Sequence, residues 1–304
     1  MNIKNPIFDE LKKLKLIKSL NLIQLHSKTR DKNIKVIQDN KTKIIFLEKY
    51  FCKKNYYETL KFEDHDRKLT KKRKRFTFIK TTNGKIKTPI ISDDHRRAKY
   101  FFKYFKNKSI LDFGCRYGAF LNLIKNAKSL YGVELNERCI HYIRKKIKKI
   151  KVENNINLFD KKFDLITMFH VLEHIPSQVE TLKILKSKLN KKGKIIIEVP
   201  HAEDFLILQN ELKKFKNFTF WSEHLILHTY KSLKTILLNA GFKKIKIDYY
   251  QRYNFANHLG WFLKNKPGGH EFYKNIIDEK LNKSYCENLI KIRQTDTLIA
   301  IAEK

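Results

Sequence analysis

The chain has few cysteines for its length, and this scarcity excludes the simplest cysteine-based sites. Its 304 residues contain only four, Cys52, Cys115, Cys139 and Cys286. They lie too far apart in sequence to form a CxxC pair, so their spacing favours neither a zinc site nor a small disulfide framework. A reducing compartment is the expectation that fits this cysteine usage best.

Long apolar runs are also missing. The first stretch, MNIKNPIFDELKKLKLIKSL, mixes Asp, Glu and Lys into its apolar positions and so lacks the continuous apolar core of a signal peptide. No later stretch reaches the length needed to span a bilayer. We therefore expect a soluble, cytoplasmic protein without a transmembrane segment, while peripheral association with a membrane or a larger assembly stays open.

Acidic residues are scarce, with 31 Asp and Glu against 66 Lys and Arg, for a formal net charge of +35. Such a surplus attracts nucleic acid, anionic membranes or phosphorylated substrates. Lysine, asparagine and isoleucine are nevertheless enriched together in every segment, as a global coding bias would produce. The dense basic runs at 71–75 and 144–149 are not interleaved with aromatic residues as in a base-stacking surface. The sequence thus disfavours a nucleic acid partner.

The first 94 residues are expected to form an extension and a connector. Apolar residues at helical spacing predict a helix over 5–26. Two short alternating runs, 34–37 and 43–47, flank the turn-like Asp39-Asn40 and predict a hairpin. The polar, basic stretch from about 61 to 92, broken by Asn83-Gly84 and Pro89, predicts a loop-rich connector.

From about residue 95 to 304 the pattern alternates between strands and helices, which is typical of an α/β fold with a doubly wound parallel sheet. Strands are expected near 109–113, 129–134, 149–152, 163–169, 194–200, 242–248 and 297–302. Helices are expected at 118–127, 137–149, 178–189 with a stop signal at 191–193, and 230–239 closed by Gly241. The segment 249–295 interrupts this pattern, and an insertion of that size usually carries function or oligomer contacts.

A glycine loop joins the first of these strands to its helix in LDFGCRYGAFL, residues 111–121. In Asp112-x-Gly114-x-x-x-Gly118 the glycines let the backbone approach a ligand, and the helix N-terminus offers free N–H groups. Glu134 ends the next strand, twenty residues beyond Gly114, where an acid can bind both ribose hydroxyls of an adenosine. Together these features favour a nucleoside cofactor.

Five stretches resemble, in order, the successive motifs of class I S-adenosylmethionine-dependent methyltransferases: LDFGCRYGAFL, YGVELN, FDLITMFHVLEHIP, GKIIIEVP and WSEHLILHTYKSLKTILLNAGF. The likeness covers about residues 95–248, and its FHVLEHIP and EH…AGF elements resemble the branch that methylates small molecules and sugars. It implies a Rossmann-like, mostly parallel seven-stranded sheet with an antiparallel last strand, and S-adenosylmethionine as cofactor.

The resemblance assigns eight residues to the cofactor: Asp112, Gly114, Cys115, Gly118, Glu134, Asn154, Asn155 and Phe169. Asp112 and Gly114 would lie at its methionine end, Glu134 on the ribose, the two asparagines beside the adenine, and Phe169 near the sulfonium. Arg116 departs from the usual glycine of the family, which puts the close packing of that turn in doubt.

Methyl transfer mainly requires a nucleophile aligned with the methyl carbon, and a base is needed only for a poor nucleophile such as a sugar hydroxyl. The candidate catalytic residues are His170, Glu223 and His224. In the similar sugar C-methyltransferases an EH pair is linked with proton handling. The zinc-binding cysteines that begin those enzymes are absent here, so O-methyl transfer is favoured over N- or C-methyl transfer. His174 is interpreted as a local hydrogen-bonding residue. No metal is expected, because the histidines are dispersed in sequence.

The insertion carries RYNFANHLGWFLKNKPGGH, in which aromatic residues alternate with polar and basic ones. Such a segment suits a sugar ring with a phosphate, although a core helix followed by a turn is an equal alternative. The favoured function is methylation of a small molecule or a carbohydrate hydroxyl, in surface polysaccharide or nucleotide-sugar biosynthesis.

Two other classes remain open. The net charge favours an RNA methyltransferase, but the fourth strand ends in FHVLEH and not in the Asn/Asp-Pro-Pro-aromatic motif of enzymes that modify exocyclic amines. A non-catalytic assembly protein in which Arg116 blocks the cofactor pocket is the second alternative. The acceptor, the methylated atom and the oligomeric state do not follow from the sequence.

Overall fold

The computed structural model describes residues 3–52, 55–59, 77–81, 84–88, 92–273, 275–276 and 278–304. The chain divides into two compact units. The first comprises Met1–Phe51, Phe169–Lys186 and Ile196–Glu303, and the second comprises Cys52–Met168, Ser187–Ile195 and Lys304. The division of the chain into residues 1–94 and 95–304 stays a prediction.

The main sheet has seven strands in the order β12-β13-β10-β9-β6-β7-β8. Their bounds are β6 (Ser109–Phe113), β7 (Ser129–Val133), β8 (Ile150–Glu153), β9 (Phe163–Phe169), β10 (Leu189–Pro200), β12 (Lys243–Tyr250) and β13 (Thr297–Glu303). β6 pairs in parallel with β7 and β9, and β7 with β8, whereas β13 is antiparallel to β12. The predicted fold class is confirmed, including the antiparallel last strand.

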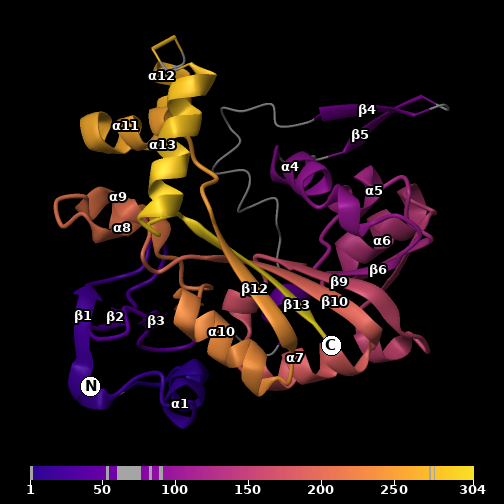
Figure 1. Ribbon diagram of the computed structural model, residues 1–304, viewed down its shortest axis with the longest axis horizontal. Coiled ribbons are helices and arrows are strands. Elements are labelled where there is room, and N and C mark those ends of the chain that lie inside the picture. The colour runs from indigo at the N-terminus through magenta and orange to yellow at the C-terminus, as the bar shows by residue number, and fades with distance from the viewer. Residues whose placement is uncertain are drawn as a thin grey trace. The chain divides into compact units, whose positions relative to one another are not determined.

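In the second unit, short helices flank the strands (Figure 1). They are α2 (Tyr56–Thr59), α4 (Ser92–Tyr100), η2 (Phe102–Tyr104), α5 (Ala119–Leu123), α6 (Glu137–Lys146) and η3 (Ile156–Leu158). α6 begins at Asn136, whose side chain accepts hydrogen bonds from the backbone of Arg138 and Cys139, and ends in three basic residues that complement the helix dipole. Both α5 and α6 are shorter than the predicted helices at 118–127 and 137–149.

The predicted loop-rich connector contains regular structure, which corrects that expectation. Strands β4 (Thr77–Thr81) and β5 (Gly84–Thr88) pair antiparallel within it, with Thr81 opposite Gly84. Asn-Gly is a favoured hairpin turn sequence, so a motif that was taken as a break in regular structure is equally a hairpin signal. The basic run 71–75 lies outside the described residues.

The first unit contains a second sheet, of order β1-β2-β3-β11. Its strands are β1 (Leu22–His26), β2 (Val36–Asp39), β3 (Ile45–Leu47) and β11 (Ile226–Leu227). β2 and β3 pair antiparallel, which confirms the predicted hairpin. Asp39 fixes the turn, because its Oδ1 accepts from the backbone N–H groups of Lys41 and Thr42.

The predicted helix over 5–26 is wrong beyond its first half. α1 spans Pro6–Lys13, a 3₁₀ turn η1 spans Ser19–Asn21, and the rest is strand β1. Lys15 has φ +54°, a left-handed conformation that stops the helix. The apolar residues that follow pair with β2, Leu22 lying opposite Asp39, so the pairing partner overrides the helical spacing.

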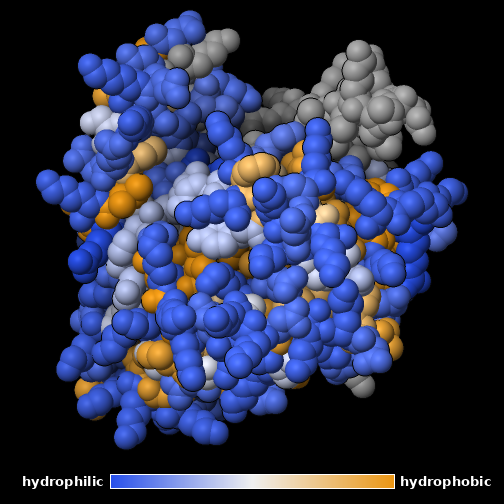
Figure 2. All heavy atoms as spheres, turned by 45° about the vertical axis from the view of Figure 1, so that its right-hand side comes forward, coloured by the Kyte–Doolittle hydropathy of each residue, from blue (hydrophilic) through white to orange (hydrophobic). Residues whose placement is uncertain are grey.

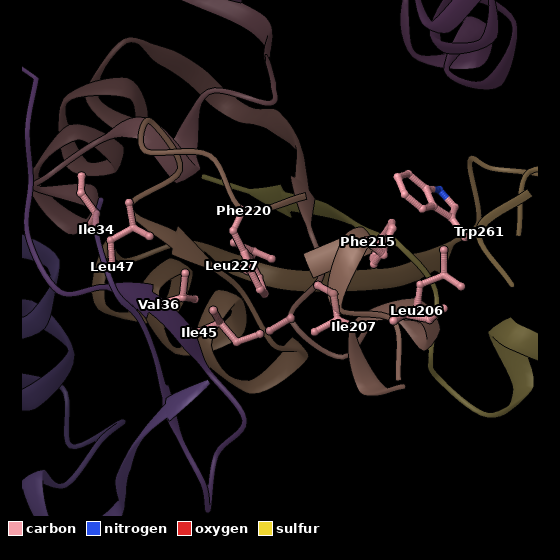
Figure 3. Packing of buried hydrophobic residues seen from close by; sticks show 12 residues of the cluster. Ile34, Val36, Ile45, Leu47, Leu206, Ile207, Phe215, Phe220, Leu227 and Trp261 are labelled. Atoms are coloured by element: carbon pink, nitrogen blue, oxygen red, sulfur yellow. The ribbon is translucent and has the colours of Figure 1, made fainter. Parts of the chain in front are cut away.

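The remaining helices of the first unit are η4 (Leu172–His174), α7 (Gln178–Ser187), α8 (Phe205–Leu208), α9 (Lys213–Thr219), α10 (Tyr230–Asn239), α11 (Phe255–Lys264), α12 (Gly269–Phe272) and α13 (Glu279–Lys291). A buried cluster joins the small sheet to α8, α9 and α11 (Figure 3). Its members include Val36, Ile45, Leu227, Phe215 and Trp261. The N-terminal strands thus share a hydrophobic core with the insertion.

The end of α7 and the start of β10 differ from expectation. The predicted helix end at 191–193 lies inside β10, which begins at Leu189. Gly193 is needed there because a Cβ would come within 2.9 Å of the Asn190 carbonyl oxygen. α10 ends as predicted, at a left-handed Gly241 with φ +85°.

Hydrophilic residues cover most of the face drawn in Figure 2, and hydrophobic residues form separate patches between them. Among the described residues, no helix is both long and apolar enough to cross a bilayer.

Candidate active site

The loop between β6 and α5 has the backbone that its glycines predict. Gly114 has φ +83° and Gly118 has φ +70°. The backbone N–H of Gly114 donates to the carbonyl of Val133 at 2.8 Å, which ties the loop to the end of β7. A Cβ on Gly118 would lie 3.1 Å from Cδ1 of Ile150. The second glycine therefore meets both a conformational and a packing requirement.

Arg116 also takes a left-handed conformation, with φ +47°. Arginine thus stands at a position whose backbone favours glycine, and it does not change the course of the loop. Its backbone N–H donates to Oε2 of Glu134 at 2.7 Å. The departure from the usual glycine is therefore accommodated at the cost of backbone strain of about 1–2 kcal/mol.

Glu134 is buried, with 7% of its surface exposed, and is held by two backbone donors. Oε2 accepts from Arg116 and Oε1 accepts from the backbone N–H of Asn136 at 2.9 Å. Each carboxylate oxygen has a second lone pair, so the oriented side chain can still accept two hydroxyl donors. This is the capacity that a ribose diol requires.

Asn136 extends this group to a segment that sequence reasoning did not assign to the site. Its Nδ2 lies 3.4 Å from the carbonyl oxygens of Tyr57 and Glu58, in α2. Nothing in the local sequence around Tyr57 predicts this contact.

Asp112 lies buried at the end of β6. The hydroxyl of Thr167, opposite it on β9, donates to its Oδ1 at 2.6 Å. Burial raises the pKa of Asp112 to about 7, although the hydrogen bond from Thr167 and the charge of Arg97 act in the other direction. Thr167 and Arg97 were missed because nothing in the local pattern distinguishes them from sheet and helix residues.

Three further residues predicted to hold the cofactor have different environments. The buried Cys115 packs its side chain where a Cβ on Gly132 would otherwise lie, and burial raises the pKa of its thiol. Asn154 and Asn155 are exposed after β8, and the Asn155 side chain accepts from the backbone of Asn157 at 2.9 Å. Their part in cofactor binding stays a prediction.

In the first unit, His170 follows the half-buried Phe169 at the end of β9 and has φ +53°. Its Nδ1 lies 3.0 Å from Oε1 of Glu173, and its Nε2 lies 3.1 Å from Oε1 of Glu198. Nη1 of Arg252 also lies 3.0 Å from Nε2. Burial and Arg252 lower the pKa of His170, but the two carboxylates outweigh them and raise it above its usual value.

A second group of side chains lies around Glu173. The donor atoms of Glu173, His174 and His224 all lie within 4.8 Å of one another, and the two imidazole rings meet edge to face at 4.9 Å between centroids. Burial, together with the neighbouring His174, lowers the pKa of His224 to about 3. The structure therefore brings together histidines 50 residues apart in sequence, and the interpretation of His174 as a purely local residue is incomplete.

Glu223 is half-buried beside His224 but is not among these three grouped side chains. His228, four residues after His224, is fully buried, and its Nδ1 lies 3.1 Å from the hydroxyl of Ser232. That serine forms a capping box with Thr229 at the start of α10. His228 thus belongs to the helix cap.

The aromatic residues of the insertion divide between core and surface. Trp261 is 4% exposed and packs against Phe215 and Phe218, with ring centroids 5.1 and 5.0 Å away. Tyr253 and Phe262 are about half exposed. His258 is buried and has the Tyr285 hydroxyl 2.8 Å from its Nδ1. The segment thus follows the core-helix alternative at Trp261 and His258, while Tyr253 and Phe262 lie at the surface.

Comparisons with known proteins bear on the domain as a whole. A family model described as a methyltransferase domain matches residues 88–247. A tRNA U34 carboxymethyltransferase of Nautilia profundicola is 30% identical over 154 residues, covering 46% of this chain and 49% of that protein. An uncharacterized protein of Methanocaldococcus jannaschii is 34% identical over 122 residues, covering 38% of this chain and 52% of that protein. The chain spans about half the length of the curated relatives it matches.

A crystal structure of a SAM-dependent methyltransferase from Archaeoglobus fulgidus has 25% sequence identity and a TM-score of 0.48, over 70% of this chain and 93% of that one. The family match covers more than half of the residues, so the chain belongs to the methyltransferase domain family. The sheet order and the antiparallel last strand place it in class I, whose methyl donor is S-adenosylmethionine. The buried Glu134, with acceptor capacity left on both oxygens, fits that cofactor.

Proposed function

We propose that this protein transfers a methyl group from S-adenosylmethionine to a hydroxyl group of a small molecule or carbohydrate. The observation that carries the proposal is the placement of His170 between the buried carboxylates of Glu173 and Glu198. A hydroxyl is a poor nucleophile and needs a proton acceptor, whereas an amine or a thiolate does not.

The two partners of Nε2 allow His170 to take up a proton and release it. In the neutral imidazole, Nδ1–H donates to Glu173, and Nε2 accepts from Arg252. After protonation, Nε2–H donates to Glu198 at 3.1 Å. Both states therefore have hydrogen-bond partners, which suits a residue that changes its charge during each turnover.

In the proposed reaction the acceptor oxygen attacks the methyl carbon of the sulfonium, and the carbon–sulfur bond breaks. Its electron pair stays on sulfur, which gives S-adenosylhomocysteine, while the hydroxyl proton passes to His170. Asp112, the 114–118 loop with Cys115, Glu134, Asn154, Asn155 and Phe169 are assigned to cofactor binding. Glu223 and His224 are assigned to the acceptor.

The test supplies labelled S-adenosylmethionine with nucleotide sugars and oligosaccharides to the wild type and to His170→Gln. We expect the variant to lose about two to four orders of magnitude in turnover with unchanged cofactor affinity. His141→Ala, an exposed histidine on α6, is the control and should retain wild-type turnover. Equal turnover of His170→Gln and the wild type would contradict the proposed base.

RNA is the second candidate acceptor, because several relatives are named tRNA U34 carboxymethyltransferase and the net charge is +35. If RNA is the acceptor, label should enter tRNA and not the sugars. Its affinity should fall steeply as salt rises, since bound phosphates release counterions. Label in sugars with no salt-dependent tRNA binding would exclude this alternative.

A further inference from the structure

Glu173, His174 and His224 form a donor set that neither the resemblance nor the comparisons assign. Glu173 and His174 belong to η4, and His224 precedes β11. All three lie in the first unit. Two imidazoles and one carboxylate are a ligand set for divalent transition metals such as zinc, iron and manganese.

The spacing of these side chains suits a single ion. Their donor atoms all lie within 4.8 Å of one another. Ligand bonds of about 2.0–2.2 Å place the donors around one ion no more than about 4.4 Å apart. The present limit of 4.8 Å is close to this span, so small side-chain adjustments would bring the three donors onto one ion.

Glu173 provides a second, independent indication. Its side chain is fully buried, and Oε2 has no hydrogen-bond partner among the described residues. A buried carboxylate oxygen without a partner is costly, because it has lost its hydration without compensation. A bound cation would satisfy this oxygen.

The backbone around the donors is fixed. The N–H of Leu225, next to His224, donates to the carbonyl of Glu173 at 2.9 Å. The carbonyl of Leu225 accepts from Nδ2 of the buried Asn5 at 3.1 Å. Gln178 donates to the carbonyl of Leu172 at 2.7 Å, which holds η4 from its other side. The donors are thus preorganised by hydrogen bonds from three separate segments.

His170 completes the arrangement as an outer partner. Its Nδ1 lies 3.0 Å from Oε1 of Glu173 and so orients the carboxylate while leaving Oε2 open. Carboxylates that bind metals are commonly held by such outer hydrogen bonds. We propose that Glu173, His174 and His224 bind a divalent transition-metal ion.

The test measures metal binding directly and needs neither acceptor nor activity. Metal-free protein is titrated calorimetrically with Zn²⁺, Mn²⁺ and Mg²⁺, and with Co²⁺ while its visible absorption is followed. We expect one ion per chain, with Zn²⁺ bound more tightly than Mn²⁺ and Mg²⁺ most weakly. His224→Ala and Glu173→Gln should each lose at least a hundred-fold in affinity, and His170→Gln about ten- to hundred-fold.

His141→Ala is the control for incidental binding by surface histidines, and its affinity should equal that of the wild type. If Glu173→Gln fails to fold, the half-buried His224→Ala decides the question, with circular dichroism to verify its fold. The absence of stoichiometric binding, or equal affinity in the wild type and His224→Ala, would overturn the metal site. Metal binding without transfer to any hydroxyl would instead contradict only the proposed function.

Discussion

The backbone N–H of Arg116 donates a hydrogen bond of 2.7 Å to Oε2 of Glu134. This contact joins the loop after β6 to the end of β7, so the residue expected to bind the ribose also fixes the loop beside it. The arginine that departs from the usual glycine makes the contact through its backbone. Loop geometry and ribose recognition are therefore coupled in this chain.

Glu134→Gln should weaken cofactor binding, and it should also loosen the loop after β6, because the amide nitrogen cannot accept from the backbone N–H that the replaced oxygen binds. The amide can accept at only one of its two terminal atoms, so one charge-assisted hydrogen bond to the ribose is lost, at a cost of about 1.5–3 kcal/mol, or roughly ten- to hundred-fold in Kd. Calorimetry with S-adenosylhomocysteine measures the change. Glu137→Gln, an exposed acid in the first turn of α6, is the matched control. Equal affinities of wild type and Glu134→Gln would contradict the ribose assignment.

Arg116→Gly and Gly118→Ala should have opposite effects on stability. Arg116→Gly removes left-handed strain at φ +47° but adds conformational freedom to the unfolded chain. We therefore expect its free energy of unfolding to rise by up to about 1 kcal/mol. Gly118→Ala forces alanine to φ +70° and sets a Cβ 3.1 Å from Ile150. We therefore expect its free energy of unfolding to fall by about 1–2 kcal/mol.

Urea unfolding gives both free energies. We also expect Arg116→Gly to bind the cofactor with the affinity of the wild type. A large loss of affinity in that variant would mean that the arginine side chain itself contributes to the site.

The sheet could be predicted because its strands are encoded locally. Buried strands such as Phe163–Phe169 appear as continuous apolar runs, and the helices between them have their own start and stop signals. β1 could not be predicted, since Leu22–His26 continues a stretch with helical spacing and becomes a strand only by pairing with β2. Local pattern fails where a distant partner decides the structure.

The candidate site likewise contains a part that the sequence predicts and a part that only the folded structure brings together. The glycine loop and Glu134 were found because their spacing along the chain is characteristic. The group around Glu173 was not, because His174 and His224 come together only when the loop before β11 is tied to η4. For the insertion, the sequence leaves an acceptor surface and a core helix as equal alternatives, because it does not reveal that Phe215 and Phe218 cover Trp261.

Asp112→Asn should change how stability depends on pH. The folded pKa of Asp112, about 7, lies above its unfolded value of about 3.8, so the folded state binds the proton more tightly. Stability from this group is therefore present at low pH and is lost as pH rises from about 4 to 7. The asparagine cannot ionise and avoids this loss.

As pH rises from 4.5 to 7.5, the free energy of unfolding of Asp112→Asn should increase by roughly 2–3 kcal/mol relative to that of the wild type, since each pKa unit corresponds to about 1.4 kcal/mol. Urea unfolding at several pH values measures the difference, from which the other titrating groups cancel. A difference that stays constant with pH would mean that Asp112 ionises normally in the folded protein.

Trp261→Ala and Phe262→Ala should separate the core of the insertion from its surface. Trp261 is 4% exposed between Phe215 and Phe218, so its truncation leaves a cavity and should cost about 3–5 kcal/mol. Phe262 is 40% exposed, and its truncation should cost less than about 1 kcal/mol. Urea unfolding of the two variants gives the comparison.

If the two costs were equal, Trp261 would not be part of the hydrophobic core that joins the insertion to the N-terminal sheet. If Phe262→Ala weakened acceptor binding at unchanged stability, the exposed half of the insertion would contact the acceptor, as the sequence RYNFANHLGWF suggests for this segment.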